Sequence, residues 1–367
     1  MNNPFQEYTF LNGATLKNKF VLAPMTTYSS NDDLTLSDDE EIYYNSRAKQ
    51  FGMVITAATA VSKNAQAFES QISIRDERYL DSMKRLATSI KKEGAKAVVQ
   101  LHHGGRMNQP NLYSNQEIVS ASAVKANKEY CATPRELKNS EVYDVLDYFT
   151  NATKLAIRAG FDGIELHGAN TYLLQQFFSP NSNHRDDEFG GSREKRLRFI
   201  IELVDRVINI KREFASKEFI IGYRFSPEEL EDPGITLDDT LYLVDKLSSK
   251  DIDYLHISLG KYGQTSMRDE SDKEPIIKKI QQRINNKMPI IGVGRIESLE
   301  DVTNCEKLGY DLFAIGFLSL SDAKVVEHIQ NKEIFNKEIT SDSLLPKRLY
   351  NKLGSWLVNN DRGFTIK

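Results

Sequence analysis

Short apolar, β-branched runs alternate with longer amphipathic segments along most of the chain. A strand that is buried on both faces reads as a continuous apolar run, whereas a surface helix repeats its apolar residues every three to four positions. Each apolar run here is followed by a longer amphipathic stretch. The pattern predicts strands at Lys19–Met25, Met53–Ala58, Ala95–Leu101, Gly163–His167, Phe219–Phe225, Tyr254–Ser258, Pro289–Val293 and Leu312–Gly316.

Signals for the ends of helices agree with this pattern. Three predicted helices begin with a capping box, in which a hydroxyl is followed three positions later by a carboxylate. A glycine precedes the third, fourth and eighth strands, where a left-handed residue commonly ends a helix. Repeated strand–helix units with eight parallel strands favour a closed barrel over an open sheet, so we predict a single α/β domain with the (β/α)₈ TIM-barrel fold. The signals lie at 37–40, 236–239, 298–301, Gly94, Gly160 and Gly309.

Three predicted connections are too long to be simple turns. Residues 102–139, 168–191 and 260–272 follow the carboxyl ends of the third, fourth and sixth predicted strands. In a barrel of this kind the active site lies at that end, and long loops in a compact domain commonly carry function. The chain past about residue 330 exceeds what the barrel needs. We therefore predict a barrel over 1–330 and an extension over 331–367 that packs on the barrel or on a neighbouring subunit.

Composition narrows the class of protein. A chain of 367 residues with 40% hydrophobic residues can fill a core of barrel size. The net charge of −4, without a block of like charge, argues against nucleic-acid and anionic-membrane partners. Two cysteines cannot build an iron–sulfur cluster alone, and neither a signal peptide nor a spanning apolar run is visible. We expect a cytoplasmic enzyme that acts on a small-molecule substrate. The enzyme is free to form a homo-oligomer.

The segment after the fourth predicted strand carries the densest group of reactive side chains. His167 and Asn170 both offer neutral donors for one substrate oxygen, and Tyr172 adds a weakly acidic hydroxyl. Two donors aimed at a carbonyl stabilise the negative charge that develops there, and a nearby tyrosine can deliver a proton. A histidine and an asparagine at this spacing are by themselves more often structural, because short motifs arise easily by chance.

Three longer motifs favour a functional over a structural role for His167 and Asn170. They are APMTTY at 23–28, QLHHGGR at 100–106 and QQFFSPNSNHRDDEFGGSR at 175–193. Together they resemble the Old Yellow Enzyme family, with the first motif closer to its bacterial branch. The resemblance covers roughly residues 5–330. It implies a TIM barrel that binds FMN and acts as an NAD(P)H:enone oxidoreductase, with NADH or NADPH as reductant.

The resemblance also implies residues for the flavin. Thr26 would place a hydroxyl beside the reactive N5, and the amide of Gln100 would pair with the pyrimidine edge. Arg224 would stabilise negative charge on the reduced flavin, and an unpaired charge inside a strand is otherwise hard to justify. The glycines after the seventh and eighth strands would let backbone amides approach the phosphate, and the alternative is that they serve tight turns alone. The predicted cofactor set is Pro24, Met25, Thr26, Ala58, Gln100, Arg224, Gly292, Gly294, Arg295 and Gly316.

Two positions depart from the family pattern. Phe317 stands where the family usually has an arginine near the phosphate, so FMN would be held less tightly unless Arg295 supplies the charge. Thr171 stands where the family usually has a glycine before Tyr172. A β-branched residue disfavours positive φ, so that loop, and the tyrosine with it, is expected to shift.

These observations together predict an ene-reductase, an FMN-dependent oxidoreductase for conjugated carbonyl and nitro compounds. The substrate would bind at Tyr28, His167, Asn170 and Tyr172, take a hydride from the flavin N5 and receive a proton from Tyr172. Two alternatives stay open, an FMN-binding barrel with lost or altered turnover and a flavin-free lyase or aldolase. No metal site is expected, because neighbouring residues of a strand point to opposite faces and His102 therefore cannot pair with His103.

Overall fold

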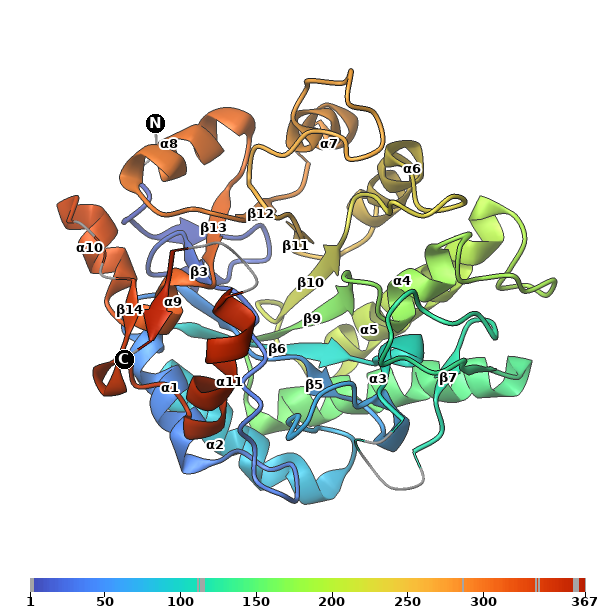
Figure 1. Ribbon diagram of the computed structural model, residues 1–367, viewed down its shortest axis with the longest axis horizontal. Coiled ribbons are helices and arrows are strands. Elements are labelled where there is room, and N and C mark those ends of the chain that lie inside the picture. Colours follow the sequence, from blue (N-terminus) through green and yellow to red (C-terminus); the bar gives the residue numbers. More distant parts are fainter. Residues whose placement is uncertain are drawn as a thin grey trace.

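Parallel strands close into a barrel in the computed structural model, which describes residues 3–110, 112, 116–285, 287–333, 335, 337–358 and 363–366. The ring runs in the order β4, β3, β13, β12, β11, β10, β9, β6, and a pairing of β6 with β4 closes it. The predicted TIM barrel is therefore confirmed (Figure 1). The ring strands are β3 (Phe20–Leu22), β4 (Met53–Ile55), β6 (Lys96–His102), β9 (Gly163–Gly168), β10 (Ile220–Phe225), β11 (Tyr254–Ile257), β12 (Ile290–Val293) and β13 (Leu312–Ile315).

Helices surround the strands, as Figure 1 shows. The capping boxes predicted at Ser37 and Thr236 are both formed, and Ser298 accepts from the backbone N–H of Asp301. Gly160 and Gly309 end their helices with φ of 85° and 102°, as predicted. The helices are α1 (Asp38–Ala48), α2 (Leu80–Lys91), α3 (Asn139–Ala159), α4 (Leu173–Phe178), α5 (Arg193–Phe214), α6 (Leu237–Ser248), α7 (Ile276–Ile284), α8 (Leu299–Leu308), α9 (Leu318–Ser321), α10 (Val325–Asn331) and α11 (Lys347–Val358).

Several strands are shorter at their carboxyl ends than the apolar pattern predicts. β3 stops at Leu22, where the prediction continued to Met25, and β4 stops at Ile55, where it continued to Ala58. Pro24 has no N–H for a ladder hydrogen bond, which explains the early end of β3. After β3 the apolar run continues through Ala23, Pro24 and Met25, which line a cavity at this end of the barrel.

The amino end of the barrel is closed by the first residues of the chain. β1 (Tyr8–Thr9) and β2 (Thr15–Leu16) form an antiparallel hairpin. Its Phe10 packs with the buried residues of the barrel interior, and the rings of Phe10 and Tyr254 lie 6.2 Å apart. A plug at this end leaves the carboxyl end as the side on which a ligand can enter.

The described part of the C-terminal extension packs on its own barrel. Arg47 of α1 is fully buried and donates to the carbonyls of Ser319, Ser343 and Leu344. Lys352 of α11 lies 4.7 Å from the ring centre of Tyr28. The domain boundary near residue 330, and any contact with a second subunit, stay predictions. The short elements here are β14 (Glu338–Ile339), β15 (Thr365–Ile366) and η4 (Ser341–Ser343).

None of the helices in the described ranges is long and apolar enough to cross a membrane. The described residues also contain no group of three histidine, cysteine, aspartate or glutamate side chains arranged to hold a metal ion.

Candidate active site

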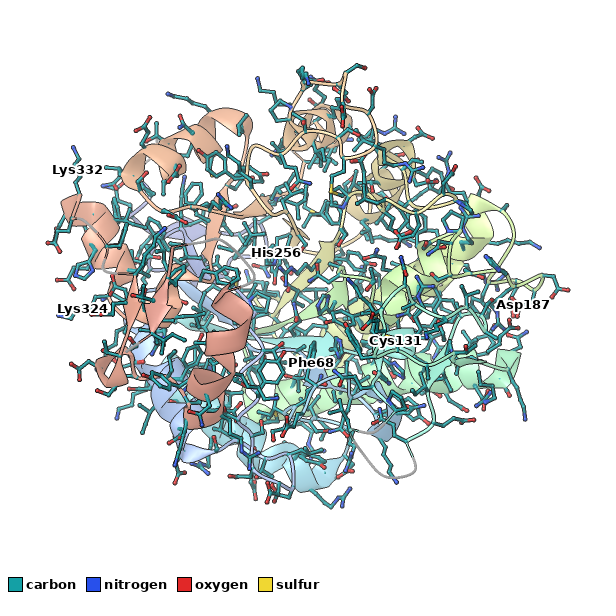
Figure 2. The ribbon with its side chains drawn as sticks, viewed as in Figure 1. Phe68, Cys131, Asp187, His256, Lys324 and Lys332 are labelled. Atoms are coloured by element: carbon teal, nitrogen blue, oxygen red, sulfur yellow. The ribbon has the colours of Figure 1, made fainter. Side chains whose placement is uncertain are left out.

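Three neighbouring strands carry charged and polar side chains in one row at the mouth of the barrel. The register places Arg224 of β10 between His167 of β9 and His256 of β11. Gln100 of β6 pairs in register with Glu165 of β9. All of these side chains are buried. Figure 2 shows His256 close to the middle of the barrel view.

Glu165 lies next to this row, two residues before His167 on β9 and in register with Gly222 of β10, and it accepts several hydrogen bonds. Its Oε1 accepts from Nε2 of Gln100 at 2.7 Å, and its Oε2 lies 3.0 Å from the hydroxyl of Tyr254 and 2.8 Å from Nδ1 of His256. Burial acts to raise the pKa of Glu165, but His256, Arg224 and Gln100 together outweigh it and lower that pKa. Glu165 was not among the predicted site residues. A carboxylate inside a continuous buried strand was the signal, because such a charge needs partners.

Arg224 keeps hydrogen-bonding capacity for a ligand. Its Nη2 donates to Oγ of Ser258 at 3.3 Å, while its Nε is buried without a hydrogen-bond partner among the described residues. Burial lowers the pKa of Arg224, and Glu165 opposes that change. Nε2 of His256 is likewise buried and unpartnered. Unsatisfied buried polar atoms are uncommon in folded proteins, so they mark a place that a polar ligand fits.

Glu165 sets the orientation of the Gln100 amide. Because its Nε2 is engaged with the carboxylate, the oxygen is the atom left to accept from a ligand. The sequence prediction gave Gln100 both a donor and an acceptor toward the flavin. The structure engages one of the donors elsewhere, and the acceptor matches the N3–H of a flavin pyrimidine ring.

A cavity of about 130 Å³ lies between the ends of β12 and β13 and the segment after β3. A Cβ added at Gly294 would come within 2.8 Å of the Leu259 carbonyl oxygen, so a side chain there would clash with backbone. Such a glycine-lined pocket with an arginine suits a phosphate. Six of the predicted cofactor residues line it together with Phe317, namely Pro24, Met25, Arg224, Gly294, Arg295 and Gly316.

The remaining predicted cofactor residues lie elsewhere. Gly292 is not part of the cavity lining, and a Cβ there would meet the ring of Tyr310 at 2.6 Å, so this glycine serves packing. Thr26 is half-buried and Ala58 is buried, and neither lines the cavity. Their contacts with the flavin, and that of Gly292, stay predictions.

Three of the four predicted substrate residues, Tyr28, His167 and Tyr172, belong to one aromatic cluster. The ring centre of Tyr172 lies 5.0 Å from that of His167 and 4.4 Å from that of His102. Phe68 lies 5.9 Å from Tyr172 and 5.9 Å from Tyr28, which joins Tyr28 to the group. Figure 2 marks Phe68 near the centre of the view. Phe68 and His102 had no substrate role in the sequence prediction, because their neighbours come from distant segments.

Both histidines of the cluster are neutral. The Gln71 amide accepts from the N–H groups of Ala67 and Phe68 and so donates through Nε2 to Nδ1 of His102 at 3.0 Å. Nδ1 of His167 accepts from the N–H of Ala169 at 3.3 Å. Burial lowers the pKa of His102 to about 3 and that of His167 far below its usual value. Each imidazole therefore carries its proton on Nε2.

Thr171 adopts positive φ despite its β-branched side chain. Its φ is 67°, and that of Asn170 is 55°. The surroundings hold this strained turn, since Thr171 donates its N–H to Oε1 of Gln175 at 3.0 Å and accepts from Nε2 of Gln176 at 2.6 Å. Threonine disfavours this backbone, but hydrogen bonds from α4 compensate for it, and Thr171 adopts the positive φ. The expected shift of the loop and of Tyr172 stays a prediction. Burial raises the pKa of Tyr172, so its hydroxyl stays protonated.

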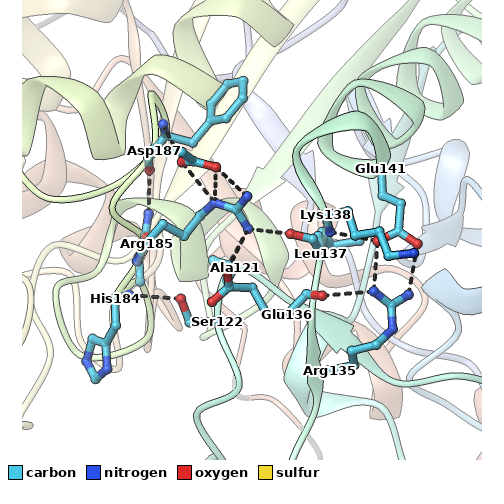
Figure 3. Close-up of polar contacts among 12 residues, drawn as sticks. Ala121, Ser122, Arg135, Glu136, Leu137, Lys138, Glu141, His184, Arg185 and Asp187 are labelled. Carbon is cyan, nitrogen blue, oxygen red and sulfur yellow. Dashed lines mark hydrogen bonds and ion pairs between the residues drawn. The ribbon is translucent and has the colours of Figure 1, made fainter.

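The motif at 175–193 is hydrogen-bonded to the loop after β6 (Figure 3). Arg185 donates through Nη1 to the carbonyls of Ala121 and Leu137 at 3.0 and 2.6 Å, and it pairs with Asp187. The backbone N–H of His184 donates to Oγ of Ser122 at 2.9 Å. These contacts fix the loop after β9 against the loop after β6, which contains β7 (Val119–Ser120) and β8 (Arg135–Glu136).

Comparisons with known proteins agree with this site. A model of the NADH:flavin oxidoreductase / NADH oxidase family matches residues 5–336. The probable NADH-dependent flavin oxidoreductase YqiG of Bacillus subtilis is 44% identical over 312 residues, which cover 85% of this chain and 83% of YqiG. A structure of morphinone reductase in complex with tetrahydroNAD superposes with a TM-score of 0.79 and 26% identity over 92% of each chain.

A further relative is much longer than this chain. NADH:fumarate oxidoreductase of Klebsiella pneumoniae is 42% identical over 314 residues, which cover 85% of this chain. The matched segment is only 34% of that relative. This chain therefore corresponds to about a third of that protein.

Proposed function

The chain belongs to the NADH:flavin oxidoreductase / NADH oxidase family, and we propose that it reduces activated alkenes, conjugated carbonyl and nitro compounds, with NADH or NADPH as reductant. It is an FMN-dependent NAD(P)H oxidoreductase, as the motifs at 23–28, 100–106 and 175–193 predicted. Membership of an FMN family argues against the flavin-free lyase or aldolase. The observation that carries the proposal is that Arg224 lies in register with His167, whose ring contacts that of Tyr172.

The residues present fit FMN. Arg295 and the backbone around Gly294 and Gly316 would hold its phosphate, and Gln100 and Arg224 would hold its pyrimidine edge. FMN, when bound, supplies a hydride at its N5. The buried Nε–H of Arg224, which has no partner among the described residues, supports a ligand with an acceptor at this point.

His167 and Asn170 would bind the oxygen of the substrate. The neutral His167 donates through Nε2–H, and Asn170 donates through its amide. Donors that are already oriented stabilise the negative charge that develops on this oxygen without reorganising. Tyr172, kept protonated by burial, would donate its hydroxyl proton to the α-carbon.

Anaerobic rapid mixing tests this function. Holoenzyme is reduced with one equivalent of NADH or NADPH and mixed with 2-cyclohexenone, a nitroalkene or fumarate while flavin absorbance is recorded. Reoxidation by an enone or nitroalkene, with the saturated compound as product, is the expected result. Rapid reduction by NADH without reoxidation by any alkene contradicts it.

That second outcome corresponds to the alternative of altered turnover. An enzyme of this kind would take electrons from NADH and pass them to another acceptor. The length of the Klebsiella relative, of which this chain matches 34%, favours this reading as the second candidate. Cytoplasmic location, substrate identity and homo-oligomer formation stay predictions.

A further inference from the structure

Glu165 is a fully buried carboxylate that the proposed reaction does not use. Three donors converge on it from three other strand positions, namely Gln100, Tyr254 and His256. An ion this deep is costly unless it is compensated, and removal of one partner of a buried pair leaves the other charge unbalanced. The group that balances the charge of Glu165 therefore indicates which part of the site this carboxylate influences.

The charge that balances Glu165 is Arg224. Burial lowers the pKa of His256 even beside the carboxylate, so the imidazole is neutral and donates through Nδ1 as a dipole. Tyr254 stays protonated, because burial and Glu165 both raise its pKa. Glu165, Tyr254, His256 and Arg224 thus carry one negative and one positive charge between them. They are separate, since no direct ion pair joins Glu165 to Arg224 among the described residues.

The same carboxylate determines whether the oxygen or the NH₂ group of the Gln100 amide is available to a ligand. Gln100 binds Glu165 through Nε2, so its oxygen is left for a ligand donor. Loss of the acceptor at Glu165 would let the amide turn over. A flavin pyrimidine edge presents one donor, N3–H, between two carbonyl acceptors, so the orientation of this amide affects its fit.

We propose that Glu165 is a positioning residue with two effects. It makes the flavin site stabilise negative charge on the pyrimidine ring less strongly. It also holds the Gln100 amide with its oxygen toward the flavin N3–H. The inference rests on the proposed position of the flavin beside Gln100 and Arg224. Arg224 attracts the charge of the reduced flavin, and Glu165 offsets part of that attraction. Neutralising Glu165 leaves the cation of Arg224 uncompensated in the barrel interior.

Sulfite binding measures this property directly. The sulfur lone pair of sulfite forms a bond to N5 of oxidised flavin, and an electron pair moves to the pyrimidine ring, where the negative charge is held. Nothing leaves, and no reductant is needed. The sulfite Kd of the holoenzyme therefore reports how well the site stabilises that charge, independently of substrate turnover.

The variants are E165Q and Y254F, each saturated with FMN. We expect the sulfite Kd of E165Q to fall by about tenfold, the size expected of one charge removed from the interior, and its flavin reduction potential to rise. Y254F loses one hydrogen bond to the same carboxylate but keeps its charge, so its sulfite Kd should stay within about twofold of the unsubstituted enzyme. A purely structural role predicts equal or weaker sulfite binding in both variants, and that result overturns the proposal.

A second measurement needs no charge-removing variant. Infrared difference spectra of the unsubstituted holoenzyme, reduced minus oxidised, should contain an ionised carboxylate band, with E165D used for its assignment. A protonated-carboxyl band that shifts in E165D would overturn the proposal even if E165Q does not fold. Failure of the proposed function is a different result, because the unsubstituted protein would then retain no FMN or leave every alkene unreduced.

Discussion

Ser258 donates its hydroxyl to the side-chain oxygen of Asn170 at 2.9 Å. The same hydroxyl accepts from Nη2 of Arg224 at 3.3 Å. The first contact orients the Asn170 amide, so that its NH₂ group is the part left for a substrate. Ser258 therefore links the cation of the proposed flavin site to one of the two proposed substrate donors.

Replacement of this serine should weaken the substrate donor without removing it. In S258A the Asn170 amide loses its orienting partner, and we expect kcat/KM for an enone to fall by about tenfold. The FMN Kd should change little, because Arg224 keeps its charge. Steady-state assays with 2-cyclohexenone check this, with S249A, an exposed serine on α6's C-terminal side, as control. Equal loss in FMN affinity and kcat/KM would mean that Ser258 acts on Arg224 alone.

Tyr172 should matter for only one half of the reaction. In Y172F the proton donor is lost, so reoxidation of reduced flavin by an enone should slow by about a hundredfold. Reduction by NADH needs no proton from this residue and should keep its rate. Stopped-flow measurement of the two half-reactions separates them.

The pH dependence of the reoxidation step follows from the same tyrosine. The active form is protonated, and burial raises the pKa of Tyr172. The fall of the reoxidation rate at alkaline pH therefore moves to higher pH. The unsubstituted enzyme should show no loss of this rate up to about pH 10, the usual pKa of tyrosine. A limb near pH 8 would point to another donor.

Phe317 lines the predicted phosphate cavity, where an added cation should strengthen binding. We expect F317R to lower the FMN Kd by about tenfold through a charge-assisted contact with the phosphate. Riboflavin, which has no phosphate, is the control ligand, and its Kd should not change. Fluorescence titration of flavin-free protein measures both. A parallel gain for riboflavin would place the new side chain against the ring system instead.

The sequence predicts those features whose causes are local. The capping box at Ser37 and the helix-ending Gly160 depend on residues within four positions, and both were predicted. Glu165 and Tyr254 are 89 positions apart, and Arg47 and Leu344 are 297 positions apart. Side chains of this kind acquire partners only when the barrel closes. A buried charge such as Glu165 or Arg47 needs partners, but sequence spacing could not say which residues would supply them.

Buried neutral histidines should make the protein sensitive to acid. Burial lowers the pKa of both His102 and His103 to about 3, whereas an unfolded chain titrates near 6.5. Between these values the unfolded state binds protons that the folded state does not. Stability is therefore complete above about pH 6.5 and falls as the pH drops toward 3, by up to about 1.4 kcal/mol per pH unit for each histidine.

The contribution of one histidine can be isolated. His103 accepts from the N–H of Gly105 at 3.1 Å, a contact that a glutamine oxygen can reproduce without titrating. The loss of unfolding free energy between pH 6.5 and 5.5 should be smaller in H103Q than in the unsubstituted protein, by up to about 1.4 kcal/mol. H184Q serves as control, because His184 is exposed. Urea unfolding at fixed FMN concentration measures these differences, and an unchanged pH slope in H103Q would mean that His103 takes up its proton in the folded state.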